Sequence, residues 1–409
     1  MTSDAQIVDP FVETSDEVVE PVIPMLDIPG HDAGRNGLPN RSQLTTLQKA
    51  VVDSSAIADV GLRTAIASVV AGAVLPSVVS GALRRSTSKR ERQGLEFYTE
   101  IAQHKNSELS FPAPMSLPQV RVRRADPFTE FIAKGNVDII SFQSSFQPLN
   151  PLMRDRWNNF SRNNIAWAQH WRHDDGPRPT LCLIHGFMGS AYMFNGLFFS
   201  LPWFYQIGYD VLLYTLPFHG RRAERNSPFS GYGYFANGLT GFAEAMAHAV
   251  HDFRSVVDWL CHNGVDRIAL TGMSLGGYTS ALAASVDDRL QAVIPNVPVV
   301  NPESTFDDWW PASKLVAATR VLSGVSREAS CAASAYHSPL NYTPKVAKDR
   351  RLIITGLGDR LAPPQQAEAL WEHWDRCKLH WFPGNHILHV SQPDYLRRMT
   401  RFLRPVMFD

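Results

Sequence analysis

A single serine stands between two glycines in the stretch GMSLG at residues 272–276, where a strand pattern gives way to a helix pattern. The preceding run RIALTGM suits a buried strand, and the following run SLGGYTSALAA is typical of a helix. Gly272 and Gly276 would let the strand and the helix pass closely, with the serine exposed on a sharp turn. The helix N-terminus would then stabilise negative charge next to the hydroxyl. Ser274 is therefore predicted to be a nucleophile.

A serine hydroxyl is a poor nucleophile until a histidine, itself oriented by an acid, takes its proton. Asp359 closes the run RLIITGLGD, and His386 ends the later run KLHWFPGNH, so each follows a predicted strand. Their chain order of serine, acid and histidine fits a known form of the triad. We predict Asp359 as the acid and His386 as the base. The competitors are His380, which alternates inside a strand, His389, which lies a helical step further on, and the acids Asp307 and Asp308.

Two backbone amides are predicted to bind the oxyanion that forms when the serine attacks a carbonyl. One is the N–H of Leu275, and the other is the N–H of Phe187 in the loop HGFMGS after the run TLCLI. Loss of one such donor typically lowers kcat by about 10²–10³-fold. His185 in the same loop is expected to shape the turn rather than to act as the base. Met273, beside the nucleophile, is expected to contact the substrate.

These residues require a sheet whose strands end at one edge. From about residue 119 onward, strand-like runs such as VDIISFQSSF, TLCLIHG, YDVLLYTLP and LQAVIPNVPVV alternate with helical ones. This alternation predicts an α/β fold with a mostly parallel sheet and helices on both faces. The core is expected over residues 119–300 and 350–409. Residues 301–349 interrupt the alternation and are predicted to be a lid or cap insertion over the C-terminal edge of the sheet, where ligands bind.

The segments HGFMGS, GMSLGG, GLGD and PGNH, in this order, resemble those of the α/β-hydrolase superfamily, and most closely its serine esterase, lipase and dienelactone-hydrolase or oligopeptidase-like branches. The resemblance covers roughly residues 137–409 and includes the turn LPFHGRR. It implies the α/β-hydrolase fold and a Ser274, His386 and Asp359 triad, with the Phe187 and Leu275 amides as the oxyanion hole. It also implies acyl transfer through an acyl-enzyme, with no metal and no cofactor. A serine at position 274 argues against dehalogenases and epoxide hydrolases, because these members of the superfamily carry aspartate at the corresponding turn.

The expected substrate is a small-molecule or lipid ester. Trp309 and Trp310 in the insertion would form an apolar wall for an acyl chain or anchor the insertion to the core. Arg221, grouped with Arg222 and Arg225 after LPFHG, suits phosphate or carboxylate recognition or is simply solvated. The alternative functions are a peptidase or acyltransferase with the same triad, and a non-catalytic scaffold whose N-terminal helices recruit a partner.

The first third of the chain lies outside the resemblance. Residues 1–42 are acidic and rich in proline and are predicted to be a flexible tail. Residues 43–118 are predicted to be a helical extension in which residues 64–83 carry no charge. Two interpretations of that apolar segment stay open. It is either a helix or helical pair bent at Pro76 and packed on the protein, or a peripheral or single-span membrane contact through residues 64–92.

Composition narrows the classes of partner. Lys and Arg number 39 and Asp and Glu number 39, so no overall field attracts nucleic acid, and no nucleic-acid partner is expected. The 4 cysteines form no CxxC pair, which argues against a zinc site and a disulfide framework. The N-terminus lacks the pattern of a secretory signal, so the expected localisation is cytoplasmic, with membrane association as the open addition. The sequence gives no indication of oligomeric state.

Overall fold

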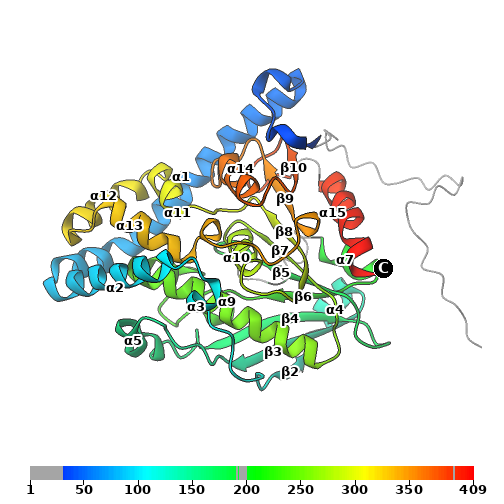
Figure 1. The fold of residues 1–409 in the computed structure, drawn as a ribbon, viewed down its shortest axis with the longest axis horizontal. Helices are drawn as coiled ribbons and strands as arrows, with labels where there is room; N and C mark the ends of the chain where they lie inside the picture. Colours follow the sequence, from blue (N-terminus) through cyan, green and yellow to red (C-terminus); the bar gives the residue numbers. More distant parts are fainter. Residues whose placement is uncertain (1–30, 190–191, 193–199, 390–391) are drawn as a thin grey trace, which may run out of the picture.

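The computed structural model describes residues 31–189, 192, 200–389 and 392–409. At its centre is a 10-stranded sheet in the order β1-β10-β9-β8-β7-β5-β6-β4-β3-β2 (Figure 1). Neighbouring strands from β10 to β6 run parallel, whereas the pairs at both ends are antiparallel. The strands are β1 (His31–Asp32), β2 (Arg121–Arg124), β3 (Asn136–Gln143), β4 (Ile165–Arg172), β5 (Thr180–Ile184), β6 (Asp210–Tyr214), β7 (Ile268–Met273), β8 (Leu290–Asn296), β9 (Leu352–Gly356) and β10 (Lys378–Phe382).

The central strands are apolar along their whole length because helices cover both faces of the sheet. Every residue of β5, β6, β7 and β9 is buried, which is the usual environment of parallel strands. One face packs on α9 (Gly238–His262), α10 (Leu275–Ala283) and α14 (Pro364–His373). The other packs on α4 (Pro127–Ala133), α7 (Leu201–Gln206) and α15 (Gln392–Met407). The predicted mostly parallel sheet with helices on both faces is confirmed.

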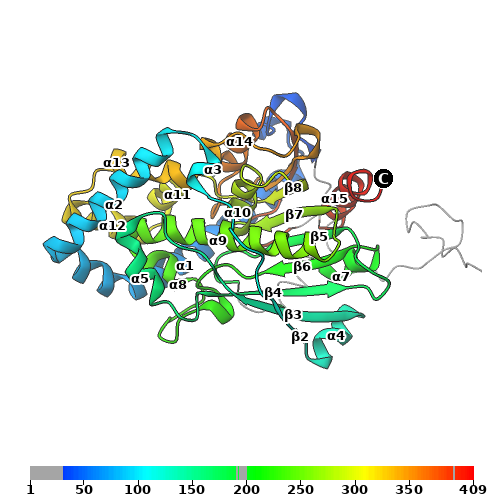
Figure 2. The same cartoon turned by 60° about the horizontal axis from the view of Figure 1, so that its bottom comes forward.

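The N-terminal helices are α1 (Thr46–Leu83), α2 (Arg85–Gln103) and α3 (Ser107–Ser110). The insertion contains α11 (Pro302–Asp308), α12 (Ala312–Ser323) and α13 (Arg327–Ser334). α2 and the later part of α1 lie beside α12 and α13 of the insertion, on the left in Figures 1 and 2, whereas α1 begins near α14 and β10 at the top of Figure 1. Two short helices, α5 (Arg154–Asn158) and α8 (Tyr232–Ala236), precede β4 and α9 in the chain. Pro76 lies inside α1, so the apolar segment is part of one long helix.

The structure describes residues 31–42 of the predicted tail. His31 and Asp32 form β1 and pair antiparallel with Trp381 and His380 of β10. Asp32 also forms an ion pair of 2.5 Å with Arg398 of α15. A two-residue edge strand has no alternation that a sequence pattern could reveal. Residues 1–30, the rest of the predicted tail, lie outside the described residues.

By length and composition, α1 is the one helix of the described chain that could cross a membrane, with 22% of the window Thr46–Pro76 buried. Core helices of soluble proteins can meet the same criterion. Two contacts dock the first half of α1 on the α/β core, because Arg63 donates to the carbonyl of Arg360 at 3.1 Å and Asn385 donates to that of Ser55 at 2.9 Å. Membrane contact through residues 64–92 stays a prediction.

Candidate active site

Ser274 is the N-cap of α10, directly after β7, with φ 56° and ψ −115°. Such a backbone conformation is costly for a residue with a side chain and persists only where its surroundings enforce it. The segments around Ser274 pack closely on the turn, because a Cβ at Gly272 would collide with the carbonyl of Gly276, and a Cβ at Gly276 would collide with the carbonyl of Ile184. The Ser274 side chain is half-buried. The strand, sharp turn and helix predicted around this serine are therefore present.

The start of α10 offers hydrogen-bond donors next to the serine. The carbonyl of Ser274 accepts from the N–H of Tyr278 at 2.8 Å, which is the first helical bond. The N–H of Leu275 belongs to the first turn, where amides have no acceptor within the helix. The loop after β5 lies against the same point, because a Cβ at Gly186 would be 3.4 Å from the Cβ of Ser274. Phe187 follows Gly186 directly, so both predicted oxyanion donors lie in segments adjoining the serine.

His185 is fully engaged in holding this loop. Its Nδ1 donates to the carbonyl of Gly186 at 2.8 Å, and its Nε2 accepts from the N–H of Leu216 at 3.2 Å. Burial lowers the pKa of His185 to about 4, so the ring is neutral. With both nitrogens occupied, His185 has the turn-shaping geometry expected of it.

Asp359 and His386 meet as a buried pair beyond the ends of β9 and β10. The Nδ1 of His386 is 2.7 Å from the Oδ2 of Asp359. The other oxygen, Oδ1, accepts from the N–H groups of Leu361 at 2.9 Å and Ala362 at 2.7 Å. Because the carboxylate holds the proton on Nδ1, the Nε2 of His386 is left as the basic nitrogen.

The pKa of His386 is set by opposing effects. Burial lowers it, but the charge and hydrogen bond of Asp359, together with the charge of Asp59, outweigh burial and raise it above the ordinary value. A raised pKa makes the ring a stronger base in its neutral form. It also means that the ring is protonated, and unable to accept a proton, below that pKa.

Among the three candidate histidines, His386 is the one whose ring is hydrogen-bonded to Asp359. His380 is fully buried within β10, and burial lowers its pKa to about 4. The ring of His389 lies 4.7 Å from that of Phe382, and burial lowers its pKa to about 4 as well. The competing acid Asp307 is paired with Arg327 at 2.7 Å in the insertion.

One buried carboxylate was missed by the sequence reasoning. Asp59 of α1 is completely buried, and its Oδ2 accepts from the N–H groups of Arg360 at 2.5 Å and Leu361 at 3.0 Å. Burial, followed by the nearby charge of Asp359, raises the pKa of Asp59 to about 6. A signal was present, since Asp59 is an acid on the same helical face as Val52 and Ser55, which are both buried.

The predicted substrate contacts fall in different surroundings. Met273 is 6% exposed and packs in the cluster on the α7 and α15 face. Trp309 donates from Nε1 to the carbonyl of Leu361 at 3.2 Å, whereas Trp310 is 59% exposed. The guanidinium of Arg221 lies 4.9 Å from the ring centre of Trp167. Substrate contact by Met273, Arg221, Trp309 and Trp310 stays a prediction.

The structure corrects the prediction that Arg222 takes part in anion recognition. Its side chain is fully buried and donates to the carboxylate of Asp252 at 2.7 Å and to the carbonyl of Asn163 at 2.8 Å. A buried guanidinium is stable only when its donors are satisfied in this way. Arg222 is therefore a core ion pair and not a ligand for a substrate anion.

Within the described ranges, no group of three or more His, Cys, Asp or Glu side chains is placed to hold a metal ion.

The family comparison covers the segment that carries these residues. Residues 243–407, from α9 to α15, match the prolyl oligopeptidase family. An acetyl xylan esterase from a Paenibacillus species has the same fold, with a TM-score of 0.52 and 16% identity, over 76% of this chain and 94% of that esterase. The chain has the α/β-hydrolase fold. The predicted fold is thereby confirmed.

Other comparisons agree with this placement of the α/β-hydrolase. Acetyl xylan esterase 1 from a Thermoanaerobacterium species gives a TM-score of 0.52 at 14% identity, over 75% of this chain and 93% of that one. Two uncharacterized proteins of Mycobacterium tuberculosis, MT2702 and Rv2627c, are each 29% identical over 306 residues, which is 72% of this chain and 69% of theirs. The segment that matches the prolyl oligopeptidase family contains Ser274, Asp359 and His386.

Proposed function

We propose that this α/β-hydrolase cleaves carboxylic esters, with Ser274 as nucleophile, His386 as general base and Asp359 as the acid that orients it. The observation that carries the proposal is the pairing of a strained serine elbow with the buried His386–Asp359 hydrogen bond of 2.7 Å. Ser274 follows β7, Asp359 follows β9 and His386 follows β10, and these strands belong to one parallel run of the sheet. Their carboxyl ends therefore share an edge, where ligands bind in such folds.

The chemistry follows from these positions in two steps. The Nε2 of His386 takes the hydroxyl proton while the Oγ of Ser274 bonds to the ester carbonyl carbon, and the amides of Leu275 and Phe187 bind the resulting oxyanion. Collapse breaks the bond to the alkoxide, which leaves with the proton from His386, and an acyl-enzyme remains. Water then repeats the sequence, giving its proton to His386, and releases the carboxylic acid and free Ser274.

Peptide bond cleavage is the second candidate, and the match to the prolyl oligopeptidase family favours it. Ester cleavage is supported by a largely apolar cavity lined by Phe242, Phe306 and Trp309, of which Trp309 is hydrogen-bonded to Leu361 in the loop of Asp359. Such walls suit an acyl group better than a polar peptide backbone, whose amides would lose their hydrogen bonds to water there. The fold-related acetyl xylan esterases are compatible with the same choice.

A substrate panel tests this choice. The purified chain is expected to hydrolyse p-nitrophenyl esters with saturation kinetics and to leave blocked peptide p-nitroanilides largely uncleaved, because the apolar walls offer the peptide backbone few partners. Release of p-nitrophenol or p-nitroaniline measures both activities by absorbance. Cleavage of a peptide anilide with a kcat/KM equal to that of the best ester would contradict the ester assignment and favour the peptidase.

A further inference from the structure

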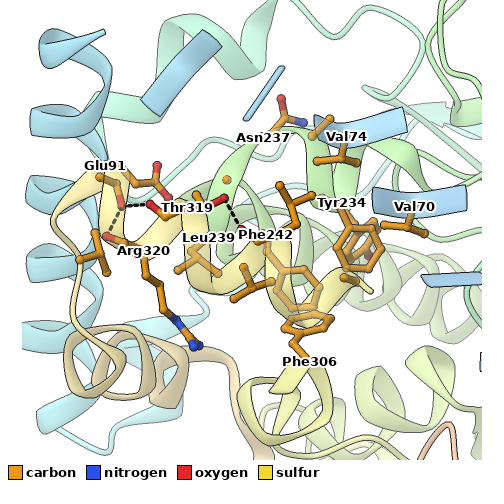
Figure 3. Close-up of a pocket in the computed structure, with 18 of the residues that line it drawn as sticks. Val70, Val74, Glu91, Tyr234, Asn237, Leu239, Phe242, Phe306, Thr319 and Arg320 are labelled. Carbon is orange, nitrogen blue, oxygen red and sulfur yellow. Dashed lines mark hydrogen bonds between the residues drawn. The ribbon is translucent and has the colours of Figure 1, made fainter. Parts of the chain in front are cut away.

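A cavity of about 390 Å³ lies between the N-terminal helices and the insertion. Figure 3 shows apolar side chains converging on it, including Val70 and Val74 of α1, Phe242 of α9 and Phe306 of α11. Leu315 of α12 completes the same wall. The apolar segment of α1, whose role the sequence left open, thus forms one side of a partly open, largely apolar cavity, whose lining also includes Glu91 and Arg320.

Two walls of the cavity reach the candidate active site. Phe235 of α8 lines the cavity and packs edge to face on Phe187, with ring centres 5.0 Å apart. Trp309 lines it as well and donates to the carbonyl of Leu361, whose own N–H binds Asp359 at 2.9 Å. Two residues that line the cavity therefore contact the loop of the proposed oxyanion donor and the loop of the proposed acid.

A series of contacts links the cavity to the start of α10. Phe242 lies 5.2 Å from the ring of His337, which in turn is 2.5 Å from the hydroxyl of Tyr278. Tyr278 is the residue whose N–H closes the first turn on Ser274. Two side chains, those of His337 and Tyr278, thus link Phe242 in the cavity wall to the turn at Ser274.

We propose that this cavity binds the acyl chain of the substrate, and that the substrate class is esters of unbranched acyl chains of medium length. The proposal rests on the ester hydrolysis proposed above. A cavity of 150 Å³ accommodates benzene, so scaling by volume gives room for roughly fifteen chain carbons at most. The aromatic walls are set edge to face, with 5.8 Å between the ring centres of Phe235 and Phe306, which favours a slender chain over a branched one.

Chain length should then control kcat/KM through burial of methylene groups. Each methylene that enters the cavity is expected to raise kcat/KM by up to about fourfold, until the cavity is full. The test compares acetyl, octanoyl, decanoyl and hexadecanoyl p-nitrophenyl esters. The wild-type chain is expected to prefer octanoyl or decanoyl esters over both shorter and longer ones.

Two substitutions on one helix separate filling of the cavity from general damage. Leu315→Trp fills the cavity from α12, and the ratio of kcat/KM for decanoyl to acetyl ester is expected to fall at least about tenfold. Val321→Trp adds the same side chain to α12 at a position that is 82% exposed, and the ratio is expected to stay within about twofold of wild type. Phe306→Ala enlarges the cavity and should move the optimum to longer chains.

An unchanged decanoyl-to-acetyl ratio in Leu315→Trp, or an unmoved optimum in Phe306→Ala, would overturn the acyl-chain assignment. Ester cleavage itself would stand in that case, since the acetyl ester would still be hydrolysed. A wild-type chain that cleaves no ester of any length would overturn the proposed function together with this inference.

The buried carboxylate of Asp59 on α1 lies next to the acid of the candidate triad. The N–H of Leu361 lies 3.0 Å from Asp59 and 2.9 Å from Asp359, so the two buried carboxylates share one donor. Three further α1 contacts hold the same two loops, because Ser55 donates to the carbonyl of Pro383 at 3.4 Å and accepts from Asn385, and Arg63 donates to the carbonyl of Arg360.

We infer that Asp59 is a positioning residue, which fixes the loop of Asp359 and adds a second negative charge beside His386. The charged and titratable groups that face it are Asp359 and Arg360 after β9, His386 after β10, and Arg63 on its own helix. A buried acid next to another acid is costly for folding, and that cost is reasonable only if the charge serves the site.

Asp59→Asn removes the charge and keeps one acceptor oxygen. Loss of a negative charge beside His386 lowers the pKa of the imidazole, so the acid limb of the kcat/KM profile is expected to move to lower pH. The pKa of Asp59, raised to about 6, is above its unfolded value, so its stabilisation is complete at low pH and is lost as the pH rises through 6. The variant should therefore gain Tm relative to wild type at pH 8 and not at pH 4.

Asp53→Asn is the matched control, because Asp53 lies on the same helix, is exposed and pairs with Arg41 at 2.6 Å. It should leave the pH profile of kcat/KM where it is. Asp59→Glu retains the charge and should keep the acid limb near its wild-type position. A profile of Asp59→Asn that superimposes on wild type would overturn the inference, whatever the change in Tm.

Discussion

Replacing Ser274 with alanine is expected to lower kcat for p-nitrophenyl esters by roughly 10⁵–10⁶-fold, as removal of the nucleophile does in triads that act as a unit. The hydroxyl is the atom that becomes acylated, and no second nucleophile is held at the elbow between Gly272 and Gly276. Folding should survive, because alanine fills the half-buried position without a new polar group. Stopped-flow and steady-state release of p-nitrophenol measure the loss, and circular dichroism checks the fold.

Ser280 provides the matched control for the nucleophile. It lies on α10 and is fully buried, and its hydroxyl donates to the carbonyl of Gly276 at 2.7 Å. Ser280→Ala removes a hydroxyl from the same helix without touching the elbow residue, so activity should fall far less than in Ser274→Ala. Turnover by Ser274→Ala within tenfold of wild type would contradict the role of Ser274.

Replacing Asp359 with asparagine is expected to lower kcat by about 10⁴-fold, the size seen when a triad acid becomes an amide. The Oδ1 of Asp359 accepts from the amides of Leu361 and Ala362, so an asparagine would keep its oxygen there. Its NH₂ group would then face the Nδ1 of His386 and force the ring proton onto Nε2, where it cannot accept the serine proton. Loss of the carboxylate charge also lowers the pKa of His386.

Asp308, the competing acid in the insertion, is exposed and serves as the control for this substitution. Asp308→Asn should leave kcat within about twofold of wild type, as expected of a surface change. The assignment of Asp359 would be wrong if Asp308→Asn were the variant that lost activity. Measuring both variants over pH 5–9 separates a lost base from a shifted pKa.

The central sheet could be predicted from the sequence because parallel strands buried on both faces leave continuous apolar runs. β5, β7 and β9 are of this kind, and they are followed by the loop of the proposed oxyanion donor, the proposed nucleophile and the proposed acid, respectively. β2 was missed because all residues of Arg121–Arg124 are exposed, so neither alternation nor an apolar run marks it. β1 was missed because two residues are too few to form a pattern.

The contribution of α1 to the site, through Asp59, could not be predicted from the sequence, because it depends on tertiary contacts between segments about 300 residues apart. Local pattern shows that α1 is an apolar helix, but not that Asp59 meets the amide of Arg360. The same limit explains Arg222, since its partner Asp252 lies on a different element, α9. The cavity wall formed by Val70 and Val74 likewise requires α12 on its other side.

The most direct test of the central claim is mass spectrometry after labelling with a fluorophosphonate, which reacts with activated serines. Trypsin releases residues 268–289 as one peptide, IALTGMSLGGYTSALAASVDDR, which holds Ser274 together with Ser280 and Ser285. We predict a single adduct on this peptide, located on Ser274 by fragmentation and absent from Ser274→Ala. An adduct on another residue, or labelling of Ser274→Ala at the wild-type rate, would contradict it.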